Sequence, residues 1–583
     1  MRPAMMAAAL LGWAVLSLVA SAAAQGADGV AARPPAPLVL TREGRVLGVH
    51  TSFEGRPLHA FYGVPYARPP LGRLRFLPPV AATPWRHVWS ARRFQGPCMQ
   101  RLEEVHYPVH LKMLQNASED CLYLNVWTAV PDQDKFDFCR KAASGAVLKP
   151  VVVILHGGGF SIGNTGSLLY DGSALAALGN VTVVSMNFRL GVFGFLDAMN
   201  RHAPGNVGLL DQRMALLWVR RNIQAFGGDP EKVTLLGLSS GAASAGLHMA
   251  APQSRSLFYA AILEGGGPLC DAFVEPSRRS LQRANHLAGL LSCSRMGAEL
   301  GNLPVKVLTC LRSRPAEDLL WAQERVASSS LSSFVATYGN AFFPKSPWKA
   351  KYLPVPLLIG TSSNEGSPFV GHRCFEQPPR VSNRSEALKL VSGLLETYNI
   401  PLPSGLPAMQ PYLDEKTASP RGQQQEDMRR FVADVFGDAA LHCPCRLFAE
   451  RHAKAKHPVF VYKFCYATSS LYVPEWMGVP HSSTFWYMSG VPLRMPERFH
   501  EVDRALSREM VRVVAHFAAK RIIGWMVLLA DATSSRVPGN FMNKPWAPLS
   551  RGSSLAMHLH PNQAGVRNDE RSAYCHYWNA RDA

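Results

Sequence analysis

Short apolar runs recur through the middle of the chain, at intervals expected of strands separated by helices. Residues 151–155 (Val-Val-Val-Ile-Leu) form a continuous apolar run, which is typical of a strand buried on both faces. Four further runs predict strands at residues 181–186, 232–236, 356–359 and 459–462. Between the second and third runs, helical spacing of apolar residues predicts a helix over residues 209–226; these residues are Leu210, Met214, Leu217 and Ile223.

The order strand, helix, strand decides the predicted fold class. It favours an α/β protein with a large, mostly parallel sheet and helices on both faces. The chain has 583 residues and no tandem repeat, and large α/β enzymes of this length often form one unit.

The amino end predicts export. Arg2 precedes an almost unbroken apolar run over residues 5–24, which closes with small residues at 20–24 before Gln25. A basic start, an apolar middle and a small-residue exit are typical of a secretory signal peptide. The run is also long enough for an uncleaved anchor, but its small residues favour cleavage. We therefore expect a signal peptide over residues 1–24, no transmembrane anchor and a secreted, extracellular protein.

The net charge and the cysteine content of the chain limit the classes of function that the sequence predicts. The formal net charge is +19, but the basic residues are scattered among apolar segments, so the sequence predicts no nucleic-acid partner. Eleven cysteines suit an oxidising compartment, and an odd number leaves at least one without an intrachain partner. Asn-x-Ser/Thr sequons predict glycosylation at Asn116, Asn180 and Asn383.

The candidate nucleophile follows the third strand. Residues 237–241 (Gly-Leu-Ser-Ser-Gly) match G-x-S-x-G and lead into a run of small residues. Residues 159–163 also match, with Ser161 at the centre. Only Ser239 comes directly after a predicted strand and before a predicted helix, as a nucleophile in a sharp strand-to-helix turn must. We therefore take Ser161 as a chance match.

A serine nucleophile needs donors for an oxyanion, a base and an acid. The glycine-rich turn at residues 156–159 and the N–H of Ser240 are candidate donors. In this arrangement the acid and then the histidine follow the nucleophile along the chain. Glu365 comes after the strand at 356–359 and His481 after the strand at 459–462, although each could equally be an ordinary loop residue.

Longer motifs distinguish these alternatives. They are residues 61–67 (Phe-Tyr-Gly-Val-Pro-Tyr-Ala), 118–127 (Ser-Glu-Asp-Cys-Leu-Tyr-Leu-Asn-Val-Trp), 191–196, 205–212 and 226–230. In these motifs the chain resembles the type-B carboxylesterases, the cholinesterase-like branch of the α/β-hydrolase family. The resemblance implies one catalytic domain over residues 36–578, followed by a short tail at 579–583.

The resemblance also assigns roles within this sequence. It implies Ser239 as nucleophile, Glu365 as acid and His481 as base, with an oxyanion hole from Gly158, Gly159 and Ser240. It implies no cofactor and no metal.

The resemblance further implies three disulfides. These are Cys98–Cys121, Cys293–Cys310 and Cys443–Cys575, with Cys445 a close rival of Cys443 for the third. Cys139, Cys270, Cys374 and Cys465 have no evident partner in the family pattern.

Departures from the family pattern fall at its choline site. Cholinesterases hold the choline cation against aromatic faces, chiefly a tryptophan between the first two cysteines. Residues 98–121 contain no tryptophan, and its place falls near Met113 or Leu114. Pro368 stands where a second ring is expected, and Leu238 and Thr484 stand where acidic residues are usual.

Three hypotheses about function follow. The first is a secreted serine esterase that forms an acyl-enzyme from small-molecule esters, as a monomer or homodimer. The second is a cholinesterase with an altered choline site. The third is a non-catalytic, neuroligin-like relative for adhesion or ligand binding; Ser239 and the lack of a hydrophobic tail after Trp578 speak against it.

Overall fold

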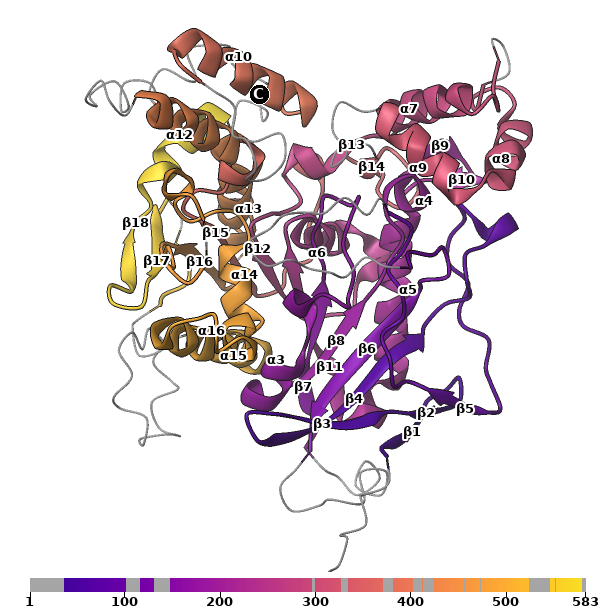
Figure 1. Ribbon diagram of the computed structural model, residues 1–583, viewed down its shortest axis with the longest axis horizontal. Coiled ribbons are helices and arrows are strands. Elements are labelled where there is room, and N and C mark those ends of the chain that lie inside the picture. Colours follow the sequence, from indigo (N-terminus) through magenta and orange to yellow (C-terminus); the bar gives the residue numbers. More distant parts are fainter. Residues whose placement is uncertain are drawn as a thin grey trace, which may run out of the picture.

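The computed structural model describes most of the chain (Figure 1). The described residues are 36–100, 116–130, 147–295, 299–326, 334–370, 381–401, 412, 424–455, 457–471, 473–523, 546–550 and 552–578. The predicted signal peptide and tail lie outside them, as do Met113, Leu114, Cys139 and Cys374. No helix in these ranges is both long and apolar enough to cross a bilayer.

One 11-stranded sheet organises the molecule, and its strand order is β18-β17-β16-β15-β12-β11-β7-β8-β6-β4-β3. Its strands are β3 (Val49–Phe53), β4 (Arg56–Pro65), β6 (Tyr123–Ala129), β7 (Lys149–Leu155), β8 (Thr182–Met186), β11 (Gly228–Leu238), β12 (Ala260–Glu264), β15 (Leu357–Ser362), β16 (Val459–Phe464), β17 (Leu555–Leu559) and β18 (Gly565–Asn568). The seven strands from β17 to β8 pair in parallel, and the pairs at both edges are antiparallel. The predicted α/β class and mostly parallel sheet are confirmed.

Smaller strands and the helices complete the fold. The small strands are β1 (Leu38–Leu40), β2 (Arg45–Leu47), β5 (Val88–Ser90), β9 (Asp197–Asn200), β10 (Ala203–Pro204), β13 (Val274–Pro276) and β14 (Ala336–Tyr338). The α-helices are α3 (Ser173–Gly179), α4 (Gly191–Phe195), α5 (Val207–Asn222), α6 (Ser240–Ala250), α7 (Ser277–Leu290), α8 (Pro304–Ser313), α9 (Ala316–Arg325), α10 (Arg384–Thr397), α12 (Gln424–Gly437), α13 (Cys443–Ala453), α14 (Ser483–Met488), α15 (Val491–Arg494) and α16 (Glu501–Lys520). Helix α5 and the 3₁₀ turn Ile223–Phe226 together cover the predicted helix at 209–226.

The alternating side chains of β7 show why its sequence is apolar throughout. Val151, Val153 and Leu155 belong to the core on one face of the sheet, which also contains residues of α5, α6 and α13. Val152 and Ile154 belong to the core on the other face, with residues of α3, α14 and α16. Because successive side chains point to opposite faces, a strand between two helical layers must be apolar at every position.

Loops at the carboxyl ends of parallel strands meet at one edge of the sheet. The turn after β7, the turn between β11 and α6, and the loops after β12, β15 and β16 therefore converge there. Helices α10 and α12 and helices α7, α8 and α9 form two separate groups at the top of the view in Figure 1.

Three disulfides join the described segments. They are Cys98–Cys121, Cys293–Cys310 and Cys443–Cys575, the same pairs that the resemblance implies. Cys445, the rival of Cys443, is a buried free thiol. The third bond ties the segment after β18 to α13 across 132 residues of sequence, whereas the second spans 17.

The second and third disulfides close chain loops of different length, so we expect them to contribute differently to the free energy of unfolding. Replacing both Cys443 and Cys575 by serine should lower the free energy of unfolding by about 5 kcal/mol, because the unfolded chain regains the entropy of a long loop. The same change at Cys293 and Cys310 should cost about 3 kcal/mol. Chemical denaturation of the purified variants measures both values. An equal or larger loss at the shorter bridge would contradict this ranking.

Candidate active site

Ser239 occupies the turn between β11 and α6. Its backbone has φ 57° and ψ −122°, a conformation that side-chain-bearing residues rarely adopt. The turn is held on both sides: Ser239 N–H donates to Glu264 O at 2.8 Å, and Ser239 O accepts from Ala243 N–H at 3.0 Å. A strained residue persists only where its surroundings fix it, and this one presents its side chain at the carboxyl edge of the sheet.

The two flanking glycines are a steric requirement of this turn. A Cβ on Gly237 would lie 2.2 Å from Gly241 O, and a Cβ on Gly241 would lie 2.1 Å from Leu155 O. Ser161 has a different setting, because its N–H donates to Gly158 O at 3.0 Å within the glycine-rich turn after β7. The second sequence match therefore belongs to a loop rather than to a strand-to-helix turn.

Glu365 and His481 form a hydrogen-bonded pair. His481 Nδ1 contacts Glu365 Oε2, and Glu365 Oε1 accepts from Ser362 N–H at 2.5 Å. Glu365 is 3% exposed and His481 is 7% exposed. The ring nitrogen that faces a carboxylate carries the proton, so Nε2 of a neutral His481 is left as the acceptor.

Asn364 joins the loops that carry this pair. Its backbone N–H donates to Val479 O, and its side-chain Oδ1 accepts from Val479 N–H, both at 3.0 Å. Gly478, with φ 57°, allows this approach because a Cβ there would lie 2.3 Å from Asn364 Oδ1. These bonds hold the two loops, 115 residues apart in sequence, in one register.

The loop after β12 lies between the pair and the candidate nucleophile. A Cβ on Gly265 would lie 2.9 Å from His481 Cε1, and a Cβ on Gly266 would lie 2.4 Å from Ser239 O. Two consecutive glycines thus contact both residues. The structure thus brings together Ser239, Glu365 and His481, the three residues that the sequence offers as candidate nucleophile, acid and base.

The glycine-rich turn after β7 borders Ser239. A Cβ on Gly157 would lie 3.1 Å from Ser239 Cβ, and Gly158 and Gly159 both have positive φ, 112° and 62°. Among the described residues, neither Gly158 N–H nor Gly159 N–H has a hydrogen-bond acceptor. Ser240 is the first residue of α6, where an N–H has no acceptor within the helix.

Buried, uncharged side chains hydrogen-bond to the backbone of this turn. Gly157 N–H donates to Tyr170 Oη at 3.0 Å, and Phe160 N–H donates to Ser240 Oγ at 3.2 Å. Burial lowers the pKa of His156 to about 4 and raises that of Tyr170, so both are uncharged at neutral pH. Sequence reasoning missed Tyr170 and Asn364 as supports, because only contacts between distant segments reveal them.

Among the described residues, the aromatic ring of Phe369 packs against the pair. The Phe369 ring centroid lies 5.6 Å from that of His481. Trp476 and Tyr170 are 8% and 6% exposed. In the described parts of the chain, no three His, Cys, Asp or Glu side chains cluster as a metal ion would need.

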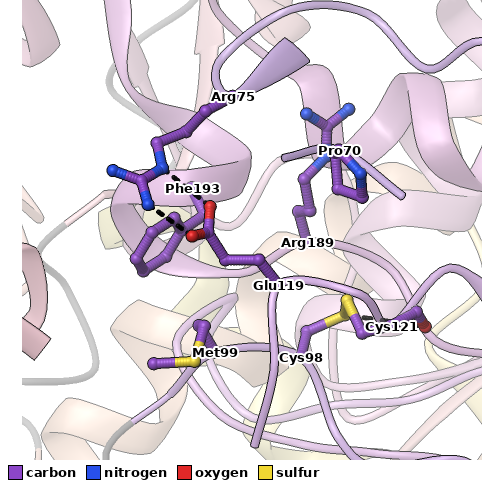
Figure 2. Close-up of a pocket in the computed structure, with 8 residues that line it drawn as sticks. All are labelled: Pro70, Arg75, Cys98, Met99, Glu119, Cys121, Arg189 and Phe193. Carbon is purple, nitrogen blue, oxygen red and sulfur yellow. Dashed lines mark hydrogen bonds and ion pairs between the residues drawn. A yellow bond between two sulfur atoms is a disulfide. The ribbon is translucent and has the colours of Figure 1, made fainter. Parts of the chain in front are cut away.

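A separate small cavity lies beside the first disulfide (Figure 2). It leaves about 10 Å³ of space accessible to water and is lined by Pro70, Arg75, Cys98, Met99, Glu119, Cys121, Arg189 and Phe193. Arg75 Nε donates to Glu119 Oε2 at 2.7 Å and its Nη1 donates to Arg314 O at 2.7 Å. These bonds are structural, and neither Ser239 nor His481 lines the cavity, so we assign it no part in the chemistry.

Comparisons with known proteins show which family the chain is similar to. A family model for the carboxylesterase family matches residues 35–578. The chain is 32% identical over 554 residues to an acetylcholinesterase of Bungarus fasciatus, an alignment that covers 93% of this chain and 86% of that protein. It is 34% identical over 497 residues to a cholinesterase of Mus musculus, which covers 82% of this chain and 78% of that protein.

The crowding at Gly265 can be tested by mutation. Gly265→Ala should lower the free energy of unfolding by about 1–3 kcal/mol, because φ at this position is 56° and the added Cβ meets His481. Gly267→Ala is the matched control, since its nearest neighbour would be Cys445 Sγ at 3.8 Å, an ordinary contact. Chemical denaturation compares them, and equal stability of the two variants would refute this description of the loop.

Proposed function

The chain belongs to the carboxylesterase family of α/β-hydrolases and is a carboxylic ester hydrolase, and from this premise we propose that Ser239, His481 and Glu365 are its catalytic triad. The observation that carries the proposal is the His481–Glu365 pair held beside a strained Ser239 turn. A serine hydroxyl becomes an effective nucleophile only when such a base takes its proton.

In the first step, His481 Nε2 accepts the hydroxyl proton as Ser239 Oγ attacks the ester carbonyl carbon. The carbonyl π electrons move to oxygen and give a tetrahedral oxyanion. His481 then returns the proton to the leaving alcohol, and the ester C–O bond breaks to leave an acyl group on Ser239. Glu365 remains ionised, orients the imidazole and stabilises the imidazolium that forms.

The oxyanion would be bound by the N–H groups of Gly158, Gly159 and Ser240. The supporting observation is that none of them is engaged by another acceptor within the described residues. Each such donor typically contributes 10²–10³-fold to the rate constant, because it is aimed in advance at the charge that develops. Water then attacks the acyl-enzyme by the same route, releasing the acid and regenerating Ser239.

We propose small esters of uncharged alcohols as the substrate class. The absence of tryptophan from residues 98–121 removes the ring on which the family binds choline. A cholinesterase with a rebuilt site is the second candidate, because the two relatives described above are named cholinesterases. Phe369 is one ring that such a site could use, since it packs against His481.

We further propose that the protein is secreted after removal of residues 1–24 and works as the single domain 36–578, as a monomer or homodimer. The three disulfides support an oxidising compartment. Asn116, Asn180 and Asn383 are all exposed, which glycosylation requires.

The nucleophile assignment predicts a large loss of turnover. Ser239→Ala should reduce kcat for a neutral ester by about 10⁴-fold or more, with an unchanged fold, because only the attacking oxygen is removed. Ser161→Ala tests the other G-x-S-x-G match and should lower kcat by less than about tenfold. Steady-state kinetics on folded variants measures both, and retained activity in Ser239→Ala would reject the triad.

The substrate proposal predicts no preference for a positive charge on the alcohol. Acetylcholine and its uncharged analogue 3,3-dimethylbutyl acetate should have kcat/KM values within about threefold of each other. An intact aromatic site would add about 2 kcal/mol, or roughly thirtyfold, in favour of the cation. The comparison is made at fixed ionic strength, because the +19 charge repels a cationic substrate at low salt. A tenfold preference for acetylcholine would support the cholinesterase candidate instead.

A further inference from the structure

Glu264 is a buried carboxyl that the mechanism above does not use. It ends β12, is fully buried, and its carbonyl oxygen accepts the N–H of Ser239 at 2.8 Å. The next residues, Gly265 and Gly266, contact His481 and Ser239. Its backbone is therefore part of the frame beneath the proposed nucleophile and base.

Within the described residues, four polar side chains from different segments surround the Glu264 carboxyl. None of these four side chains is a cation. Tyr462 Oη of β16 donates to Glu264 Oε2. Glu365 after β15, Cys445 of α13 and Thr484 of α14 are its other polar neighbours. Beyond Glu365 lies His481, its hydrogen-bonded partner. Within the described residues, Glu264 Oε1 has no partner that meets hydrogen-bond geometry.

Two carboxyls buried near each other do not both ionise, because each charge opposes the other in a medium that solvates neither. Glu365 is the better place for the negative charge, since it is bonded both to Ser362 N–H and to His481 Nδ1. Among the described residues, the Glu264 side chain accepts a hydrogen bond from the Tyr462 hydroxyl and has the Thr484 hydroxyl as a further polar neighbour, and neither group is charged. Burial, and then the charge of Glu365, raise the pKa of Glu264 well above its usual range.

We propose that Glu264 holds a proton at neutral pH and is a positioning residue for Glu365, its Oε1–H directed toward that carboxylate. The proposal rests on the triad proposed above. With Glu264 protonated, Glu365 is the charged carboxylate of the pair. Glu365 also gains the Glu264 O–H as one more hydrogen-bond donor. This hydrogen bond fixes the orientation of the Glu365 oxygens, and through them the ring of His481.

Infrared difference spectroscopy on the full-length protein tests the protonation state without any turnover. At pH 7, Glu264→Gln should remove a C=O stretching band of an un-ionised carboxylic acid. Glu450→Gln is the control, since Glu450 is 42% exposed and paired with Arg446, and only carboxylate bands should change there. Loss of carboxylate bands in Glu264→Gln would overturn the proposal.

The pH dependence of kcat/KM for a neutral ester tests the positioning role. Glu264→Gln should keep kcat within about threefold of the unsubstituted protein and leave the acid (low-pH) limb of the pH profile where it is. The reason is that the glutamine amide is neutral and still donates a hydrogen bond. Glu264→Leu should lower kcat about tenfold or more with little change in KM. It should also move the acid limb to higher pH, because Glu365 loses a hydrogen-bond donor and then holds the His481 proton more tightly. If Glu264 were ionised, Glu264→Gln would move that limb to lower pH.

A double variant separates positioning from stability. Glu264→Leu leaves the Tyr462 hydroxyl unpaired, whereas Glu264→Leu combined with Tyr462→Phe leaves no orphan group. We expect the double variant to recover stability but not kcat or the position of the acid limb. Recovery of all three would show a merely structural role and overturn the proposal. Failure of the triad itself would be distinguishable, since it would appear as activity that survives Ser239→Ala.

Discussion

The two hydrogen bonds between Asn364 and Val479 are the constraint on which the site depends. Parallel pairing of β15 with β16 brings the loops after these strands to one edge of the sheet, but the pairing ends at Ser362 and Phe464, before Asn364 and Val479. The Asn364 bonds join the two loops beyond that point. Glu365 directly follows Asn364 and His481 lies two residues after Val479, so these bonds hold the hydrogen-bonded pair together.

At the same edge of the sheet, close packing requires glycine, because a larger residue would collide with its neighbours. Gly265 and Gly478 have positive φ, and a Cβ on either would meet a residue of the site or its support. The strain at Ser239 is held in the same way, by hydrogen bonds to Glu264 and Ala243 rather than by the serine side chain. The proposed reacting groups are therefore positioned mainly by backbone geometry, which leaves their side chains available for the proposed chemistry.

The sequence predicts the central sheet well because its strands are buried on both faces. All five apolar runs appear as parallel strands, from β7 to β16. Edge strands such as β3, whose residues alternate between half-buried and exposed before the buried Phe53, give no such run and were not predicted. Ser239 could be separated from Ser161 by its strand context alone. The roles of Asn364 and Glu264 could not be predicted, because they arise from contacts between segments about 100 residues or more apart.

We propose that Ser239 is the activated nucleophile at this edge of the sheet. Reaction of the folded, active protein with a serine-directed fluorophosphonate, followed by peptide mass spectrometry, tests it most directly. We expect one phosphonyl group per chain, located on Ser239, with hydrolytic activity lost in step with labelling. A label on another residue, or an unlabelled Ser239 in fully inhibited protein, would contradict it.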